Sequence, residues 1–433
     1  MTVRVFEAFA GVGSQRMALR NLGIDHEVVA IAEIDKFAIK SYEAIHGETI
    51  NLGDISQIET ADIPDHDLFT YSFPCQDISV AGQGLGLDEG SGTRSGLLWE
   101  CQKVITGKKP KYLLLENVKN LVGKKHKHNF DRWLDWLEEQ GYTNYWKVLN
   151  AKDYGVPQNR ERVFVVSILG GHEPYEFPET VELELRLKDI LESEVDEKFY
   201  LSDEKTKTLI ANTPINESLN GLMEVGSLSH YKRNDINRVY SPQGNCPTLN
   251  TMQGGDRQPK VLIKNATKKG YLEAKGEFGR MGRQAVETLN ENDVKHSDTI
   301  NPFNKRVSSK DGISPTLTTR PEGFKTAVLP VVETLGTLAA HNSDKFGVGY
   351  MDDVSKTLKA NKHDISVLYS NLRIRKLTPK ECWRLMGFSD DDFHKAEKVN
   401  SNSQLYKQAG NSIVVDVLEG IFKQLLEVAE WND

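Results

Sequence analysis

The sequence predicts an α/β protein: a mostly parallel sheet with helices between its strands, joined to a smaller, strand-rich and irregular second domain. Within the first 170 residues, short apolar runs alternate with segments of helical periodicity. Between residues 171 and 370 the chain is richer in Asn, Thr, Lys and Gly, and helical periodicity is weak. A chain of 433 residues is long enough for two or three domains with a sizeable core.

Strands and helices are expected to alternate in the first part of the chain. Because of this alternation the connections are βαβ crossovers, which produce a mostly parallel sheet. In such sheets ligands bind outside the carboxyl ends of the strands. The expected strands are residues 3–8, 28–32, 68–73, 112–116, 145–149 and 162–168, and the expected helices are residues 14–22, 36–46, 96–105 and 129–140.

The C-terminal part is predicted to be helical again. Thr378 is followed by Pro379 and Glu381, which is the pattern of a capping box with proline in the first helical turn. Residues 413–428 have an amphipathic pattern, and we expect this helix to pack back on the first domain. The predicted domains are residues 1–170, completed by 400–433, and residues 171–399.

The composition excludes several classes of protein. No apolar run approaches the roughly eighteen residues of a membrane-spanning helix, and the N-terminus lacks the pattern of a secretory signal. The four cysteines are far apart and form no Cys-x-x-Cys pair, which argues against a structural zinc site and a disulfide framework. We expect a reduced, cytoplasmic protein with neither a bound metal nor a membrane partner. The cysteines are Cys75, Cys101, Cys246 and Cys382.

The net charge of −8 gives no indication of a nucleic-acid partner, but the distribution of charge does. Residues 1–110 hold nine Lys or Arg against sixteen Asp or Glu, whereas residues 230–283 hold eleven against four. A chain that is acidic overall and basic in one block can concentrate its phosphate contacts in that block. A solvated charged face explains the same numbers equally well.

An internal near-repeat occupies the second domain. Arg238 is followed nine residues later by Pro-Thr-Leu-Asn-Thr, and Arg306 is followed by Pro-Thr-Leu-Thr-Thr at the same spacing. A weaker third copy begins at Lys356. Since the first two copies carry turn residues before the proline, we interpret the repeat as recurring β-hairpins. Independent convergence on similar turns is the alternative.

Three places in the first domain suit a ligand with anionic and ribose groups. Residues 9–14, Phe-Ala-Gly-Val-Gly-Ser, lie between an expected strand and helix, where glycines allow close backbone approach and the helix N-terminus favours anions. A tight turn without a ligand is equally compatible. Glu33 ends the second strand and can accept hydrogen bonds from ribose hydroxyls, and Asp54 can accept one from an adenine amine. Each carboxylate alone is more often a surface residue.

Four further side chains are candidates for chemistry. Cys75 follows the third strand in Ser-Phe-Pro-Cys-Gln, where a reactive thiolate belongs, although an isolated cysteine is more often buried and inert. Glu116 ends an apolar strand, so burial is expected to raise its pKa and suit it to proton donation; a helix-start carboxylate is the alternative. Arg160 and Arg162 are two residues apart on a strand and face the same side, where they orient an anion or a carbonyl oxygen or form surface salt bridges.

Taken in chain order, these motifs resemble those of the DNA (cytosine-5) methyltransferases of the bacterial and phage restriction–modification type. The combination of Pro-Cys-Gln, Glu-Asn-Val and Gln-x-Arg-x-Arg is specific, and the resemblance covers the chain except for residues 170–370. One departure is Ile34, where many members carry a tryptophan that stacks on adenine. The matching motifs are F-A-G-V-G-S (9–14), A-E-I-D (32–35), G-D-I (53–55), S-F-P-C-Q (72–76), G-L-L-W-E (96–100), E-N-V (116–118), Q-N-R-E-R-V (158–163), R-K-L-T-P-K-E (375–381) and Q-A-G-N-S-I-V (408–414).

The resemblance implies a Rossmann-like, S-adenosylmethionine-dependent methyltransferase domain with a target-recognition domain, acting on C5 of a specific cytosine in double-stranded DNA. It implies that Cys75 adds to C6 of the cytosine and that Glu116 acts at N3. Arg162, supported by Arg160, is implied to bind O2. Because a duplex hides C6, the base must be flipped out, and the glycine-rich loop 76–95 is expected to close over it. The cofactor is expected to contact Phe9, Gly11, Gly13, Glu33, Ile34, Asp54, Leu97 and Asn411, and the DNA to contact Gln76, Ser79, Arg94, Arg233, Arg238, Arg257 and Arg320.

We expect a monomeric enzyme that serves restriction–modification or protects its own DNA. One alternative is an RNA cytosine-5 methyltransferase acting on tRNA, although such relatives usually have a small second domain. Another is a catalytically idle DNA-binding regulator, against which the intact Cys75, Glu116 and Arg162 argue. An oxidoreductase that binds a dinucleotide is disfavoured because the glycine fingerprint is incomplete.

Overall fold

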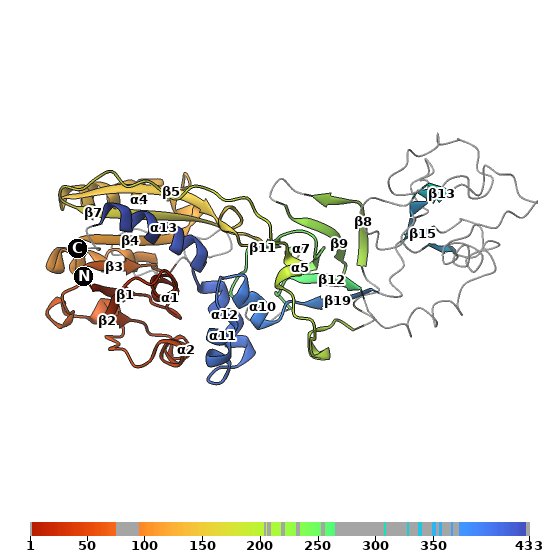
Figure 1. The fold of residues 1–433 in the computed structure, drawn as a ribbon, viewed down its shortest axis with the longest axis horizontal. Coiled ribbons are helices and arrows are strands. Elements are labelled where there is room, and N and C mark those ends of the chain that lie inside the picture. The colour runs from red at the N-terminus through yellow and green to blue at the C-terminus, as the bar shows by residue number, and fades with distance from the viewer. Residues whose placement is uncertain are drawn as a thin grey trace, which may run out of the picture.

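The computed structural model describes residues 2–74, 95–202, 221–230, 234–252, 256–264 and 372–429. Elsewhere it describes Lys205, the backbone of β8 (Leu209–Glu217) and short strands between residues 307 and 366. Figure 1 shows a large sheet at one end of the molecule and a second sheet beyond it. Three helices lie between the two sheets: α10 (Pro379–Arg384), α11 (Asp390–Glu397) and α12 (Asn402–Asn411).

The large sheet is built from the strands that the sequence predicts. They are β1 (Val3–Ala8), β2 (His26–Ala32), β3 (Leu68–Tyr71), β4 (Tyr112–Val118), β5 (Tyr142–Asn150) and β7 (Glu161–Leu169). Their spatial order is β2-β1-β3-β4-β7-β5. The first four run parallel to one another, whereas β7 is antiparallel to both β4 and β5. The predicted mostly parallel sheet is therefore confirmed, with one reversed strand.

Helices cover both faces of this sheet. Successive side chains of β4 point to opposite faces, so Leu114 packs into one hydrophobic cluster and Leu113 and Leu115 pack into another. The first cluster includes side chains of α1 (Ser14–Asn21), α2 (Lys36–His46) and α13 (Val415–Val428), and the second includes those of α3 (Cys101–Lys108) and α4 (Lys127–Glu139). The C-terminal helix α13 thus packs back on the first domain, as predicted.

The second sheet has the order β19-β12-β10-β9-β8. Its further strands are β9 (Met223–Leu228), β10 (Arg238–Tyr240), β12 (Lys260–Lys264) and β19 (Leu372–Lys376), and the short helix α7 (Asn234–Asn237) precedes β10. β12 and β19 are antiparallel neighbours that pair from Lys260 with Lys376 to Lys264 with Leu372. The two ends of the segment 265–371 are therefore held side by side.

The hairpin interpretation of the first repeat copy is wrong. β10 pairs parallel with β12, and between them the chain leaves the sheet to form β11 (Cys246–Pro247), which pairs with β6 (Gln158–Asn159) of the first domain. The buried side chain of Gln158 accepts a hydrogen bond from the Leu249 amide at 3.2 Å. The first domain therefore supplies the hydrogen-bond partners that the second strand of a hairpin would otherwise supply. The second and third copies, from Arg306 and Lys356, lie largely outside the described residues.

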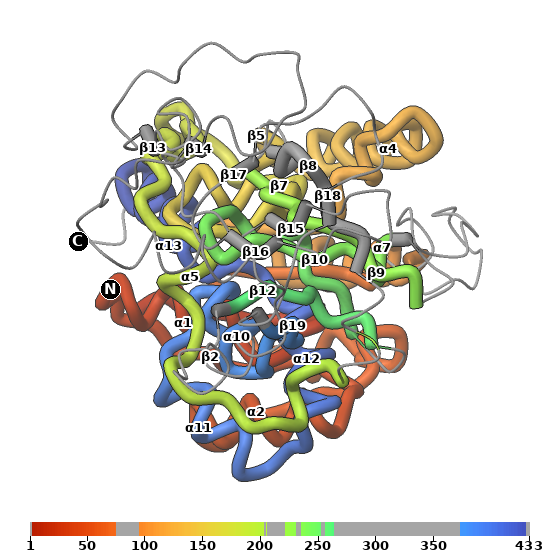
Figure 2. The backbone as a smooth tube through the Cα atoms, turned by 90° about the vertical axis from the view of Figure 1, so that its right-hand side faces the viewer, coloured from red at the N-terminus to blue at the C-terminus, as the bar shows by residue number. Residues whose placement is uncertain are grey.

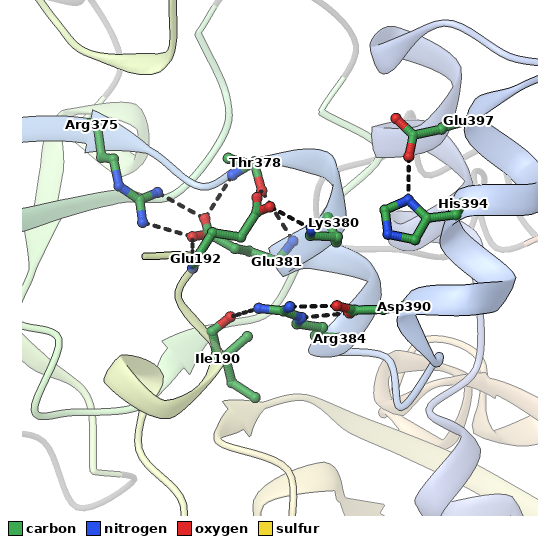
Figure 3. Close-up of polar contacts among 10 residues, drawn as sticks. All are labelled: Ile190, Glu192, Arg375, Thr378, Lys380, Glu381, Arg384, Asp390, His394 and Glu397. Atoms are coloured by element: carbon green, nitrogen blue, oxygen red, sulfur yellow. Dashed lines mark hydrogen bonds and ion pairs between the residues drawn. The ribbon is translucent and has the colours of Figure 1, made fainter. Parts of the chain in front are cut away.

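A buried ion pair joins the segments that lead out of and back into the first domain (Figure 3). The Arg375 guanidinium donates to both oxygens of Glu381 at 2.8 and 2.6 Å, and the two side chains are only 2% and 0% exposed. The same carboxylate accepts the Thr378 amide and, from the outgoing segment, the Glu192 amide, each at 2.8 Å. The predicted capping box of Thr378 and Glu381 is confirmed, and it also fixes the outgoing chain.

Helices α10 and α11 associate with the first domain. Asp392 of α11 accepts two hydrogen bonds from Arg20 of α1, at 3.1 and 2.7 Å. Side chains of both helices, among them Trp383 and Phe393, belong to the hydrophobic cluster that includes α1 and α13. We therefore propose a domain boundary near Leu377, some twenty residues before the predicted one at 400. Within the described part of the chain, no helix has the length and apolar character needed to cross a membrane.

Removing one partner of the buried ion pair is expected to destabilise the protein strongly. Arg375→Met leaves the Glu381 carboxylate buried without its cation, which typically costs about 3–5 kcal/mol of unfolding free energy. Urea denaturation followed by circular dichroism measures this loss. The control is Arg373→Ala, because Arg373 lies on the same strand but pairs with the largely exposed Glu197, so about 1 kcal/mol or less is expected. Equal losses in the two variants would contradict the special role of the buried pair.

Candidate active site

A cavity of about 670 Å³ lies at the carboxyl ends of β1, β2, β3 and β4. Its volume is within the range of about 300–1,000 Å³ that is usual for ligand sites. Residues from the loops after these four strands, from β7 and from α12 form its walls. Those of the predicted site residues that line it are Phe9, Gly11, Glu33, Ile34, Asp54, Leu97, Glu116, Arg160, Arg162 and Asn411.

Glu33 joins the loops that follow β1 and β2. Its Oε2 accepts the Gly11 amide at 2.9 Å, and its Oε1 accepts the amides of Ile34 and Asp35, each at 2.8 Å. Two carboxylate oxygens offer about four acceptor positions, so three backbone donors leave one for a ligand. The carboxylate that was predicted to bind a ribose therefore also shapes the loop around it.

Gly13 is not among the residues that line the cavity. It lies at the N-terminus of α1 with φ of 81°, a left-handed conformation that favours glycine. A Cβ atom there would lie 2.5 Å from His46 Nε2 and 2.7 Å from the Tyr42 ring. The structure thus explains this glycine by backbone conformation and by packing against α2.

The other predicted cofactor residues lie on the cavity wall at separate points. Asp54 accepts hydrogen bonds from the amide and hydroxyl of Ser56 through Oδ1, at 3.0 and 2.8 Å. Ile34 is 70% exposed, so its apolar side chain is available to the flat face of a ligand. Leu97 comes from a short helical turn before α3, and Asn411 ends α12.

Glu116 and Arg162 form an ion pair in the cavity wall. The pairing of β4 with β7 places Val118 opposite Arg162, and the Arg162 Nε lies 3.2 Å from Glu116 Oε1. Glu116 is 8% exposed. Burial raises the pKa of its carboxyl group, while the charges of Arg162 and Arg160 act in the opposite direction. The predicted upward shift of the Glu116 pKa is confirmed.

Arg160 has a different environment from Arg162. It is 3% exposed, and its guanidinium donates to three backbone carbonyls: those of Leu249 at 3.0 Å, Gly410 at 3.0 Å and Ser412 at 2.7 Å. The first carbonyl belongs to the second domain, and the other two lie at the C-terminal end of α12. Arg160 thus joins its own strand to two distant chain segments, in addition to lining the cavity.

Cys75 lies outside the described residues, as do Gln76, Ser79, Arg94, Arg233 and Arg320. The residues on either side of the segment 75–94 are hydrogen-bonded to each other. Pro74 lines the cavity, and its carbonyl accepts a hydrogen bond from the Ser95 hydroxyl at 2.8 Å. Asn117 donates to the neighbouring Phe73 carbonyl at 2.9 Å. Both ends of the segment are therefore fixed at the cavity wall.

The remaining cysteines are poor candidates for a nucleophile. Cys101, Cys246 and Cys382 are all fully buried, and burial raises the pKa of each thiol. These three of the four cysteines in the sequence are therefore poorly suited to form a thiolate. Among the described residues, no group of three or more His, Cys, Asp or Glu side chains is arranged to hold a metal ion.

Several residues near the cavity were not predicted. Ser95 and Asn117 hold the ends of the segment 75–94, and Lys407 lines the cavity and pairs with Asp35 at 2.5 Å. Gln408 donates to the Phe37 carbonyl at 3.0 Å. Asn117 belongs to the motif Glu-Asn-Val and Gln408 to the motif Gln-Ala-Gly-Asn-Ser-Ile-Val, so their positions in these motifs were an available signal.

Two of the arginines that were predicted to contact DNA are described, and both are exposed. Arg238 is exposed, with its Nε 3.6 Å from Glu224 Oε2, and Arg257 is exposed in the turn that precedes β12. Lys260, by contrast, is buried and donates to the carbonyls of Ile236 at 2.9 Å and Asp256 at 2.7 Å. Burial lowers the pKa of Lys260 to about 8. Part of the basic excess in residues 230–283 therefore serves the structure of the second domain.

Comparisons with known proteins agree with the resemblance. The family model for C-5 cytosine-specific DNA methylase matches residues 3–427. The type II methyltransferase M2.ScrFI of Lactococcus lactis subsp. cremoris is 36% identical, over 98% of this chain and 99% of that protein. The orphan methyltransferase M.SPBetaI of Bacillus phage SPbeta is 33% identical, over 98% of this chain and 97% of that protein.

Solved structures support the fold. The Entamoeba histolytica methyltransferase EhMeth matches with a TM-score of 0.57 and 16% identity, over 99% of this chain and 98% of that chain. The S. pombe Dnmt2 methyltransferase matches with a TM-score of 0.53 and 17% identity, over 98% of each chain. The predicted Rossmann-like methyltransferase fold is thereby confirmed. Given a family match over nearly its whole length, the chain belongs to the C-5 cytosine-specific DNA methylases.

Proposed function

We propose that this DNA (cytosine-5) methyltransferase transfers a methyl group from S-adenosylmethionine to a cytosine flipped out of duplex DNA, with Cys75 as the nucleophile. The observation that carries the proposal is the Glu116–Arg162 pair in the cavity wall, beside the point where the chain leads from Pro74 into Cys75. An acid, a cation and a thiol are the three groups that addition to a cytosine ring requires.

The cofactor half of the cavity suits an adenosine with a charged tail. Gly11 lets the backbone approach closely, Glu33 retains an acceptor position for a ribose hydroxyl, and Asp54 retains Oδ2 for the adenine amine. The exposed apolar side chain of Ile34 offers a surface for the adenine ring, in place of the tryptophan of many relatives. S-adenosylmethionine, when bound, supplies a methyl group activated by a sulfonium sulfur.

The target half of the cavity suits the cytosine ring. C5 of cytosine is a weak nucleophile, and addition of the Cys75 thiolate to C6 makes it enamine-like. Electron density then moves toward N3 and O2. Protonation of N3 by Glu116 and a hydrogen bond from Arg162 to O2 stabilise this density. The raised pKa of Glu116 keeps the proton available for this step.

The remaining steps restore the ring. The activated C5 would take the methyl group as its bond to the sulfonium sulfur breaks and a neutral thioether is left. The proton on C5 would then pass to solvent water. The electron pair of that C–H bond forms the C5–C6 double bond, and the Cys75 sulfur leaves C6 with its own pair. The N3 proton returns to Glu116. The enzyme thus ends the cycle with its thiolate and its acid regenerated.

We further propose that the second domain reads a fixed DNA sequence, and that the enzyme serves restriction–modification or protects its own DNA. A flipped cytosine looks alike at every site, so sequence must be read from base edges outside the pocket. Two relatives named above are a type II and an orphan phage methyltransferase, which supports either setting.

Cys75→Ala is expected to abolish methyl transfer. Bisulfite sequencing of DNA from cells that express the wild-type chain should reveal protected cytosines at one fixed sequence, and the variant should leave none. A duplex with 5-fluorocytosine at that position should form a denaturation-resistant adduct with wild type, because fluorine blocks the final elimination. An adduct that persists with Cys75→Ala would identify another residue as the nucleophile.

Glu116→Gln is expected to lower kcat by about 10²–10⁴-fold, because the amide keeps the shape of the side chain but cannot donate an acidic proton. In wild type the protonated carboxyl is the active form, so kcat should fall as pH rises through the raised pKa of Glu116. The variant should lose this limb of the pH profile. Asp54→Ala is the matched control, expected to weaken cofactor binding in calorimetry while keeping the pH profile. A profile unchanged by Glu116→Gln would assign the acid elsewhere.

Arg238→Ala and Arg257→Ala are expected to relax the target sequence. Loss of a base-reading arginine typically costs about 1–3 kcal/mol at one position of the site, whereas loss of a phosphate contact weakens all sites alike. Sequencing of the methylated sites separates these outcomes. Arg373→Ala is the control, because Arg373 belongs to the same sheet and pairs with Glu197. If both variants keep the wild-type sequence and affinity, other residues read the DNA.

A further inference from the structure

A concentrated positive charge lies in the otherwise acidic first domain, outside the block from which phosphate contacts were predicted. Residues 119–128 contain four lysines and two histidines, and no acidic residue occurs between 117 and 130. The exposed side chains of this segment are those of Lys119, Lys124, Lys125 and His128, and that of Lys127 is half-buried. We refer to these five residues as the 119–128 surface.

The 119–128 surface begins at the rim of the cavity. Val118 lines the cavity, and Lys119 is the next residue in the chain. The Lys119 ammonium lies 2.8 Å from Glu161 Oε1, and Glu161 stands between the two arginines that line the cavity. The surface therefore starts within three residues of Glu116, the residue assigned as the acid.

Part of this positive charge lies at the N-terminus of helix α4, where positive charge is unfavourable. α4 begins at Lys127 after the N-cap residue His126, which makes no side-chain capping hydrogen bond, and the first turn holds no acidic residue. The N-terminus of a helix carries the positive end of the macrodipole, so cations there are unfavourable and anions favourable. The Lys127–Asp131 pair offsets only one of these positive charges. Local conflicts of this kind are expected mainly at functional sites.

The orientation of the two domains is compatible with one ligand that spans them. In Figure 2, α4 lies toward the same side of the molecule as α7 and β9 of the second domain. Arg238 directly follows α7, and it was predicted to contact DNA. One duplex bound on this side of the molecule can therefore reach both segments.

We propose that the 119–128 surface binds phosphates of the DNA strand next to the flipped cytosine. The inference rests on the proposed function, since it presupposes a duplex at the cavity. It assigns the first domain a share of DNA affinity that is independent of sequence. Each phosphate contact releases condensed counterions, so binding should become less dependent on salt when lysines of this surface are removed.

The test is the double variant Lys124→Ala/Lys125→Ala in the full chain. Fluorescence anisotropy measures binding to two duplexes, one with and one without the methylated sequence, over a series of KCl concentrations. We expect about tenfold weaker binding of both duplexes, and a slope of log K against log [KCl] that is smaller by up to about 1.8. The KM for DNA should rise in parallel.

The control is Lys111→Ala/Lys423→Ala, which removes the same charge elsewhere. Lys111 precedes β4 at the end opposite to the cavity, and Lys423 is exposed on α13. This variant should keep the wild-type slope. The charge-reversed Lys124→Glu/Lys125→Glu should lose more DNA affinity without a lower Tm, because acidic residues suit the start of α4. A lower Tm alone, with an unchanged slope, would mean that the lysines have a structural role only.

The outcomes separate this inference from the proposed function. Suppose that wild type methylates DNA, but that Lys124→Ala/Lys125→Ala has the same salt-dependence slope as the control Lys111→Ala/Lys423→Ala. The 119–128 surface is then not a phosphate site. If the lysine variant loses affinity for an RNA hairpin but not for duplex DNA, the surface belongs to a different nucleic acid, and the inference is likewise overturned. If wild type produces no 5-methylcytosine, the proposed function fails, whatever the slopes.

Discussion

One buried guanidinium, that of Arg160, holds together the three parts of the chain that form the site. It donates to the Leu249 carbonyl of the second domain and to the carbonyls of Gly410 and Ser412 at the C-terminal end of α12, while its own backbone amide donates to the Asn150 side chain. Carbonyl groups from two distant segments converge on one cation, which ties both segments to the strand that carries Arg160. A Cβ at Gly410 would lie 2.1 Å from the Asn250 carbonyl oxygen, which shows how closely the segments approach.

The parts of the fold that were predicted correctly are those whose hydrogen bonds and packing are decided locally. The strands of the large sheet and helices such as α2 follow from apolar periodicity, and the start of α10 follows from the Thr378 capping box. The first repeat copy was misread because its partner is distant. Pro247 and Leu249 look like hairpin residues, but their partners are Asn159 and Gln158 of the first domain. Sequence periodicity carries no information about such a partner.

In the site, too, some features could be predicted from the sequence and others could not. The motifs identified most of the residues that line the cavity. Four of the motifs lie at the carboxyl ends of parallel strands, and these ends meet at one edge of the sheet. What they could not provide is the direction of each side chain. Arg160 and Arg162 are equivalent by spacing, yet one binds backbone carbonyls and the other pairs with Glu116. Ser95 was missed because a serine next to a glycine has no distinguishing pattern, and only the fold brings it to the Pro74 carbonyl.

The pairing of β12 with β19 has a consequence for how the protein can change. Lys264 and Leu372 are paired neighbours, so the chain leaves the second sheet and returns to it at one point. The free-energy cost of closing such a loop grows only logarithmically with its length, by about 0.6 kcal/mol per doubling. Whole segments can therefore be gained, lost or exchanged between these two residues while the ladder beneath them stays intact. Evolution can alter this part of the protein in blocks, without rebuilding the chemistry at the other end of the molecule.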